Sequence, residues 1–357
     1  MTPAKRALRL PTAIDMFCGC GGTTHGLKKA GFNVIAGADV RDEAAATYRL
    51  NHPDAQLFYD IRYLTPKFLL ETLGLRKGQL DLLSGCPPCQ GFSSMRTLNA
   101  RSASRDDRNN LLFDFLRLVD GLRPRAVLIE NVPGLSDNWR FVRLRRDLRA
   151  LGYSVHHAVL NSVNFGVPQR RKRLVICAIR GSHPFALQFA ATTVRTVRNA
   201  IGGLPAPVRS TNRLHRMASR HSSKIWSRIA SIPRDGGSRR DLGKRAQLPC
   251  HRVKKIGFND VYGRMAWDKV SPTITRYSNN PSKGRFLHPT QNRAISPFEA
   301  ALLQSFPKTY KFPANVTLTQ AASMIGEAFP PRMAEAIALK INQHLREIAD
   351  GRFSSPL

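Results

Sequence analysis

The first forty residues alternate between apolar and glycine-rich stretches, and this alternation restricts the fold more than any other feature. Residues 13–17 (AIDMF) read as a buried strand, which leads into the glycine-rich turn CGCGG and a helix that ends at Gly31. A second apolar strand follows at 32–40. Strand, turn, helix and strand in this order begin a doubly wound α/β sheet, whose ligands bind beyond the carboxyl ends of the strands.

The same alternation continues along the first half of the chain. We expect further strands at 79–85, 125–132, 153–166 and 170–180, and helices at 109–124 and 141–152. Helical spacing returns at 296–306 and 332–348, and the last helix should pack back on the first domain.

The stretch between these two parts has a different character. Residues 191–260 hold sixteen Lys or Arg and three acidic residues, with frequent Gly, Pro and Ser and little periodicity. A basic linker would share this composition, but Trp226 and the nearby Ile225, Ile229 and Ile232 indicate that part of it packs. We therefore predict one domain from 11–183 plus 315–350, a smaller domain at 184–300, and a hinge at 301–314.

The net charge of the chain indicates a polyanionic partner. Its 56 Lys and Arg outnumber 24 Asp and Glu, which gives a formal charge of +32. Basic side chains release the counterions that condense on phosphates, so nucleic acid is expected, although a merely basic surface would give the same count. No apolar run approaches the roughly 18 residues of a membrane helix. The N-terminus lacks a secretory signal, so we expect a cytoplasmic protein that binds no membrane.

The cysteines leave three interpretations open. Cys18-x-Cys20 and Cys86-x-x-Cys89 have spacings that occur in zinc sites, and the CPPC sequence also occurs in redox motifs. The third interpretation, which we favour over a metal site, is a nucleophile: a strand delivers Cys89 through a turn with two prolines, which hold the thiol in one place. A positioned thiolate is a strong nucleophile when its neighbours lower its pKa. A structural cysteine in a tight loop would have the same pattern.

Two acidic residues follow apolar segments near the glycine turn. Asp39 ends the second strand, where a carboxylate accepts hydrogen bonds from ribose hydroxyls in related sheets. It would otherwise cap the following helix. Asp60 follows a third short segment, where it would either meet an adenine amino group or serve as a turn residue. The spacing Gly19-x-Gly21-Gly22 departs from the dinucleotide pattern and suits a ligand without a pyrophosphate.

Six motifs occur in order along residues 11–340. They are DMFCGCGG (15–22), PPCQGFS (87–93), ENV (130–132), Gln169-x-Arg171-x-Arg173, RAISPFEAALLQSFP (293–307) and IGEAFPPRMAEAIA (325–338). This series resembles the DNA (cytosine-5) methyltransferases of bacterial type, which have a single catalytic chain with an internal target-recognition region. The resemblance implies an S-adenosylmethionine-dependent, Rossmann-like doubly wound sheet with a second, smaller DNA-recognition domain.

The resemblance also implies a mechanism. Cys89 would attack C6 of the target cytosine, which makes C5 nucleophilic enough to accept a methyl group. Glu130, in protonated form, would hydrogen-bond N3 and the exocyclic amine, as a buried carboxyl with a raised pKa can do. Arg173 would hold O2 of the base, and Arg171 would help to position the catalytic loop. Without the motif order, Glu130 would pass for a strand-end ion pair and the arginines for a solvated basic run.

Contacts with the cofactor, S-adenosylmethionine, and with its product, S-adenosylhomocysteine, are implied in the same way. The residues concerned are Phe17, Gly19, Gly21, Gly22, Asp39, Val40, Asp60, Ile61, Pro88, Leu111 and Glu327. Phe17 would stack near the adenine, and Leu111 would pack on its other side. Glu327 occupies the position of the usual asparagine, close to the cofactor, and its added charge either is accommodated or weakens binding.

Double-stranded DNA is the implied partner, with the target base flipped out because a stacked base is not reachable. The residues implied in DNA contacts are Gln90, Ser93, Arg276, Tyr277, Asn279 and Asn280. The resemblance further implies a monomer near the nucleoid of a bacterial host. It would belong to a restriction-modification system, paired with a restriction endonuclease, or be an orphan or viral methylase.

Two alternatives stay open. A tRNA cytosine-5 methyltransferase shares the fold, but its relatives tend to carry a Cys-Phe-Thr stretch near the ENV motif, where this chain has NVPGLSDNW. A DNA-binding homologue that has lost activity would be consistent with Glu327, whereas the intact Cys89, Glu130, Arg171 and Arg173 oppose it.

Overall fold

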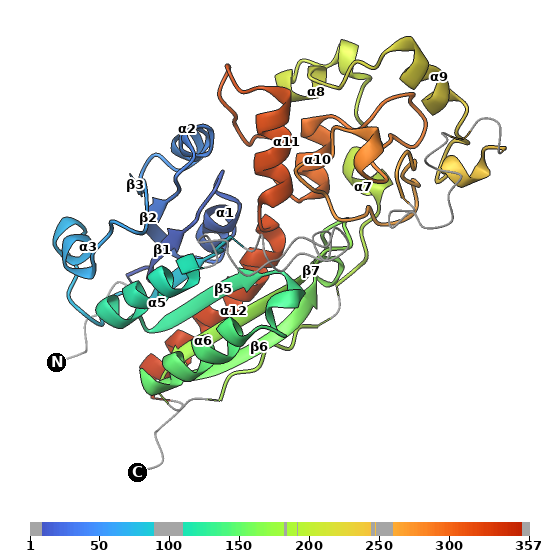
Figure 1. Cartoon of the computed structure of the whole chain (residues 1–357). Helices are drawn as coiled ribbons and strands as arrows, with labels where there is room; N and C mark the ends of the chain where they lie inside the picture. The colour runs from blue at the N-terminus through green and yellow to red at the C-terminus, as the bar shows by residue number, and fades with distance from the viewer. Residues whose placement is uncertain are drawn as a thin grey trace, which may run out of the picture.

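A single mixed β-sheet forms the centre of the larger domain (Figure 1). The computed structural model describes residues 9–88, 110–181, 184–190, 192–243, 247 and 260–351. Within these residues, seven strands are ordered β3-β2-β1-β4-β5-β7-β6. Their bounds are β1 Thr12–Met16, β2 Asn33–Ala38, β3 Gln56–Phe58, β4 Leu82–Gly85, β5 Ala126–Asn131, β6 Tyr153–Asn161 and β7 Lys172–Arg180. The first five strands run parallel, and β7 lies antiparallel between β5 and β6.

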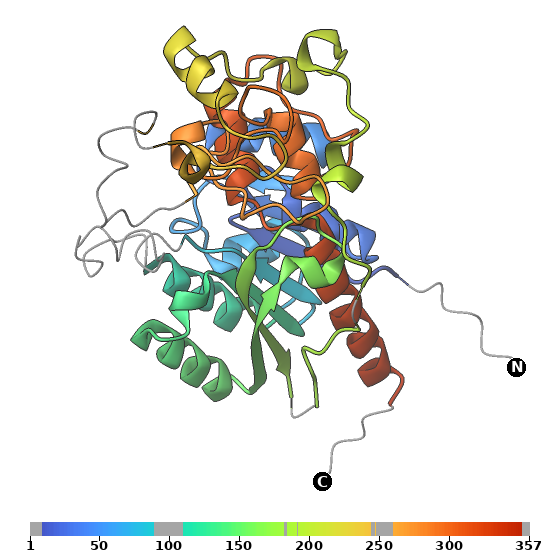
Figure 2. The ribbon, with the colours of Figure 1, turned by 90° about the vertical axis from the view of Figure 1, so that its right-hand side faces the viewer.

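Helices cover both faces of this sheet (Figures 1 and 2). One face carries α1 (Gly22–Lys29) and α12 (Pro331–Ala349). The other carries α3 (Pro66–Thr72), α5 (Leu111–Leu122) and α6 (Trp139–Ala150). Successive strand side chains point to opposite faces. Ile14 therefore joins the core under α5, while its neighbour Ala13 joins the core under α12.

The predicted doubly wound α/β sheet is confirmed, and most predicted elements are present. The helices expected at 109–124, 141–152, 296–306 and 332–348 correspond to α5, α6, α10 (Pro297–Leu303) and α12. The strand expected at 153–166 is wrong beyond Asn161, because the chain turns there into a 3-10 helix, Ser162–Phe165. Ser162 Oγ donates to Gln169 O over 2.6 Å, and Gly166 ends this turn with a left-handed φ of 67°.

The smaller part is built from short helices and irregular chain. Its helices are α7 (Val197–Ile201), α8 (Arg213–Arg216) and α9 (Ser223–Ala230). Ile229 and Ile232 are buried, whereas Trp226 is half exposed. This part shares a hydrophobic core with α10 and with α11 (Leu318–Glu327), a helix that the sequence did not predict.

One further helix lies on the β2 side of the sheet. Helix α2 (Asp42–Asn51) follows β2 and contributes Ala44 to the core shared with α10 and α11. Among the described residues, no helix is both long enough and apolar enough to cross a membrane.

Candidate active site

The carboxyl ends of four parallel strands meet at one edge of the sheet. Met16 in β1 pairs with Ala38 in β2 and with Gly85 in β4, and Gly85 pairs with Ile129 in β5. The residues that follow these four positions lie side by side at this edge; they are Phe17, Asp39, Cys86 and Glu130. The sequence predicted roles in chemistry or cofactor binding for Phe17, Asp39 and Glu130.

The glycine turn after β1 is held in an unusual backbone conformation. Phe17 has a left-handed φ of 59°, which is uncommon for a residue with a side chain. A Cβ on Gly21 would lie 2.6 Å from His52 Nε2, and one on Gly22 would lie 2.7 Å from Phe329 O. Any larger side chain at either position would collide with the rest of the protein, so both positions require glycine. A Cβ on Gly19 would instead face Arg41, 3.6 Å away.

Asp39 is fixed by the turn beside it. Its Oδ2 accepts a hydrogen bond from Gly19 N at 2.9 Å, and its Oδ1 accepts from Arg41 N at 3.0 Å and Nε at 3.3 Å. A carboxylate has about four acceptor positions, so Oδ2 keeps capacity for a ribose hydroxyl. Half-buried Phe17 and half-exposed Val40 provide apolar surface nearby. This combination fits a nucleoside.

Asp60 is more fully occupied. It accepts hydrogen bonds from Arg62 N at 2.9 Å, Nε at 2.9 Å and Nη2 at 2.6 Å, and these bonds lower the pKa of the Asp60 carboxyl. An adenine amino group would have to share this carboxylate with Arg62. The next residue, Ile61, is buried, and Leu111 packs half-buried against the same core as Ile61 and Phe17.

Glu130 and Arg173 are paired on neighbouring strands. Arg173 Nε lies 2.6 Å from Glu130 Oε1, and the side chains are 14% and 10% exposed. The next residue, Asn131, donates from Nδ2 to Pro87 O over 3.1 Å, and Pro88 is half-buried. The ENV segment therefore holds the turn that leads to position 89.

Arg171 has different surroundings from Arg173. It is 2% exposed, and its Nη1 donates to Ile274 O and to Gly326 O, each over 3.0 Å. The buried Gln169 accepts from Ile274 N at 2.8 Å and donates to Gln304 Oε1 at 2.7 Å. The Gln-x-Arg-x-Arg segment thus fastens the smaller part to the larger domain and presents only its last arginine to Glu130.

The expected DNA-contacting residues that are described lie next to this junction. Arg276 and Tyr277 are exposed, and Arg276 Nη1 lies 3.6 Å from Glu327 Oε1. Asn279 O accepts from Ser219 Oγ, and Asn280 Oδ1 caps the turn at Pro281–Lys283. Cys89, Gln90 and Ser93 lie outside the described residues.

The described cysteines of the CxC and CPPC sequences are Cys18 and Cys20, which are buried, and Cys86, which is half-buried. Burial raises the pKa of the Cys20 thiol to about 12 and raises the pKa of Cys18 and Cys86 well above the usual value, so these thiols stay protonated. The described part of the chain contains no group of three or more His, Cys, Asp or Glu placed to hold a metal ion.

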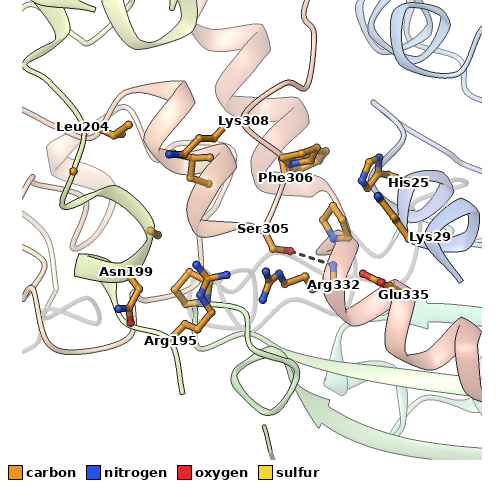
Figure 3. Close-up of a pocket in the computed structure, with 16 residues that line it drawn as sticks. His25, Lys29, Arg195, Asn199, Leu204, Ser305, Phe306, Lys308, Arg332 and Glu335 are labelled. Atoms are coloured by element: carbon orange, nitrogen blue, oxygen red, sulfur yellow. Dashed lines mark hydrogen bonds between the residues drawn. The ribbon is translucent and has the colours of Figure 1, made fainter. Parts of the chain in front are cut away.

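A cavity of about 620 Å³ lies apart from this edge, between α1, α7 and α12 (Figure 3). Figure 3 shows its basic residues Lys29, Arg195, Lys308 and Arg332, together with one carboxylate, Glu335. None of the residues expected to act in catalysis, cofactor binding or DNA contact lines this cavity, although part of its lining comes from the last two motifs.

Three contributors to the site were missed from the sequence. Arg41 binds Asp39 and Glu327, Arg62 binds Asp60, and Gln304 joins Gln169 to Ile325 O. The sequence does show an arginine two residues after each aspartate, which is a signal for the Asp39–Arg41 and Asp60–Arg62 pairs. The only signal for a partner of Glu327 is the unusual charge at that position.

The chain is similar to known proteins in sequence and in fold. The model of the C-5 cytosine-specific DNA methylase family matches residues 12–343. The chain is 36% identical over 346 residues to the Type II methylase M.HgiDII of Herpetosiphon aurantiacus, covering 93% of this chain and 95% of the relative. It is 32% identical to the Type II methyltransferase M1.BsuMI of Bacillus subtilis, covering 91% and 79%. The solved structure of the methyltransferase EhMeth of Entamoeba histolytica has the same fold, with a TM-score of 0.69, 15% identity, and coverage of 94% and 99%.

Proposed function

This chain belongs to the C-5 cytosine-specific DNA methylase family, and we propose from that premise that it methylates C5 of a flipped-out cytosine in a short duplex DNA sequence, with S-adenosylmethionine as methyl donor. The observation that carries the proposal is the pairing of Glu130 with Arg173 beside the Pro87 turn, at the same sheet edge as Asp39. The proposed base-holding pair therefore lies beside the turn that leads to the proposed nucleophile. The carboxylate proposed to bind the nucleoside, Asp39, lies at the same edge.

Cys89 is the proposed nucleophile. Its thiolate adds to C6 of the cytosine, which leaves C5 as an electron-rich enamine carbon. The bound cofactor supplies the electrophilic methyl group to C5. The C5 proton then leaves to a base such as water, the C5–C6 double bond reforms, and the C6–S bond breaks with its electron pair returning to Cys89.

Glu130 and Arg173 are proposed to hold the base during this sequence. Arg173 pairs with Oε1 of Glu130, which leaves Oε2 to meet N3 and the exocyclic amine of cytosine. The Arg173 Nη1 group donates to Lys172 O, so the guanidinium is fixed from both sides and can direct a further N–H at O2 of the base. A fixed pair of this kind aligns the base without reorganisation during reaction.

Residues around the glycine turn are proposed to hold the cofactor. Asp39 would accept from the ribose hydroxyls, with Phe17, Val40 and Leu111 around the adenine. Asp60 would reach the adenine amino group only by sharing its oxygens with Arg62. Gly21 and Gly22 would contribute through the shape of the turn, because their Cβ positions face the protein.

The relatives bear the names of Type II methylases, and we infer the same role for this chain: a modification methylase that acts as a monomer on double-stranded DNA in the bacterial cytoplasm, alongside a cognate endonuclease. The family match is to DNA methylases, so neither the tRNA alternative nor the inactive homologue is favoured.

Expression in a host without cytosine-5 methylation, followed by bisulfite sequencing of the host DNA, tests the proposal. We expect methylated cytosine in one short sequence context, and none with Cys89→Ala. Unmethylated host DNA from well-folded wild-type protein would contradict the proposed activity. Equal methylation by Cys89→Ala would contradict the proposed nucleophile.

A further inference from the structure

Glu327 occupies an electrostatically unfavourable position. It is the last residue of α11, where the final carbonyl groups give the helix end a partial negative charge, although Gln304 and Arg171 donate to Ile325 O and Gly326 O. A carboxylate there is disfavoured unless cations offset it. Two arginines do so, Arg41 at 2.6 Å and Arg276 at 3.6 Å.

The two arginines belong to different parts of the molecule. Arg41 precedes α2 and also binds Asp39, the carboxylate proposed to hold the ribose. Arg276 follows the segment that Arg171 ties to the larger domain, and it leads directly to Tyr277, whose ring its guanidinium covers at 5.3 Å. Glu327 is therefore the common partner of the cofactor side and the DNA side.

The backbone at this point leaves little room for independent movement. A Cβ on Gly326 would lie 2.1 Å from Thr275 C and 2.3 Å from Arg276 N. The chain carrying Arg276 therefore lies directly against the end of α11. The Arg276 and Glu327 side chains, by contrast, are 47% and 38% exposed, so the ion pair can exchange partners without disturbing the core.

We propose that Glu327 couples cofactor binding to DNA binding by exchanging Arg276 for a positive group of the cofactor. The proposal rests on the proposed function, because it requires both ligands. The sulfonium and ammonium groups of S-adenosylmethionine compete with Arg276 for the carboxylate, and Arg276 is released to a DNA phosphate. Each ligand therefore tightens the binding of the other, since linkage between two sites is reciprocal.

Charge gives this exchange a distinguishing property. S-adenosylmethionine carries a permanent positive charge on sulfur, and S-adenosylhomocysteine does not. The coupling should therefore be larger for the methyl donor than for the product. Exposed ion pairs contribute about 0.2–1 kcal/mol, so we expect DNA to tighten donor binding about 1.4- to 5-fold.

Isothermal titration of the full chain carrying Cys89→Ala tests this, because the donor is not consumed on DNA. The Kd for S-adenosylmethionine is measured with and without a mixed-sequence duplex, and the ratio is compared between variants. Glu327→Gln and Arg276→Ala should each bring the ratio close to one, and combining them should change it no further. Lys283→Ala removes a charge from the same segment without touching Glu327, and it should keep the ratio.

Three results would overturn the inference. One is an unchanged ratio in Glu327→Gln, and another is an equal loss of the ratio in Lys283→Ala. The third is a starting chain that binds the donor but shows no effect of DNA. A chain that binds no S-adenosylmethionine under either condition would instead contradict the proposed function itself, and the coupling with it.

Discussion

Arg173 and Glu130 face each other across the antiparallel strands β7 and β5, with 2.6 Å between Nε and Oε1. Both side chains are largely withdrawn from solvent, and the next residue after Glu130 holds the carbonyl of Pro87. One strand end thus positions a carboxylate and, through Asn131, the turn before Cys89. This relationship connects the two halves of the proposed chemistry.

Glu130→Gln should lower the methylation rate at saturating DNA and cofactor. Glutamine preserves the size of the side chain but lacks the carboxyl proton proposed to be shared with N3 of cytosine. Proton transfer by a positioned group contributes about 10²–10⁴-fold, so a loss in this range is expected. Single-turnover rates measure this loss, and Glu71→Gln, which makes the same change at an exposed glutamate, is the control. A rate within a few-fold of wild type would contradict the role of Glu130.

Arg171→Met should act on stability. The substitution removes the donor that Ile274 O and Gly326 O share, and each buried unsatisfied group costs about 1–3 kcal/mol. We expect the free energy of unfolding in urea to fall by about 3 kcal/mol. The neighbouring Arg170 is exposed, so Arg170→Met is a matched control that should change the free energy of unfolding little. Equal stability of the two variants would show that Arg171 does not hold the parts together.

Gly326→Ala should displace residues 275–276 from the end of α11. The added Cβ would meet backbone atoms at 2.1 and 2.3 Å, which no side-chain rotation can relieve. Overpacking of this kind costs about 1–3 kcal/mol or more, so we expect a lower melting temperature together with weaker DNA binding. Gly243→Ala is the control, because no described atom lies within 4 Å of the added Cβ. Wild-type melting and DNA affinity in Gly326→Ala would argue against the close contact.

Asp15→Asn should change the pH dependence of stability. Burial raises the pKa of Asp15 to about 7 from the usual 3.8, against the lowering effect of its hydrogen bond from Thr24. The folded state therefore binds this proton more tightly than the unfolded state, and stability is lost as the pH rises from about 4 to about 7. Asparagine avoids that loss. Relative to wild type, the variant's free energy of unfolding should rise by about 1.4 kcal/mol per pH unit across this window and level off above it.

Urea unfolding at intervals from pH 4 to pH 8 measures this difference. Asp54→Asn, which changes an exposed aspartate, should give a difference from wild type that is flat over the same range. A flat difference for Asp15→Asn as well would mean that the buried carboxyl is not protonated in the folded state.

The sheet edge was predictable from the sequence because it depends on local signals. Each apolar run ends at a polar residue or a glycine-rich turn, and parallel strands bring those ends together at one edge of the sheet. Asp39, Glu130 and the turn before Cys89 could therefore be grouped before any coordinates. The motif order added the chemistry that the periodicity of the strands does not contain.

Partnerships between distant residues were not predictable in the same way. Arg41 and Glu327 are 286 residues apart in sequence, and Gln169 and Gln304 are 135 apart. Nothing local marks such pairs, because the hydrogen bonds form only after the two parts have packed. Two helices of the smaller part were missed for another reason: α7 and α8 are 5 and 4 residues long, too short for a periodic pattern.

Covalent trapping on duplex DNA containing 5-fluorocytosine tests the central claim most directly. Fluorine at C5 cannot leave as a proton, so the double bond cannot reform and the C6–S bond cannot break. With S-adenosylmethionine present, the account predicts a stable complex whose mass equals protein, DNA strand and one methyl group, with the link mapped to Cys89. Cys89→Ala should give none. An equal yield of complex from Cys89→Ala, or no complex from wild-type protein that methylates ordinary DNA, would contradict it.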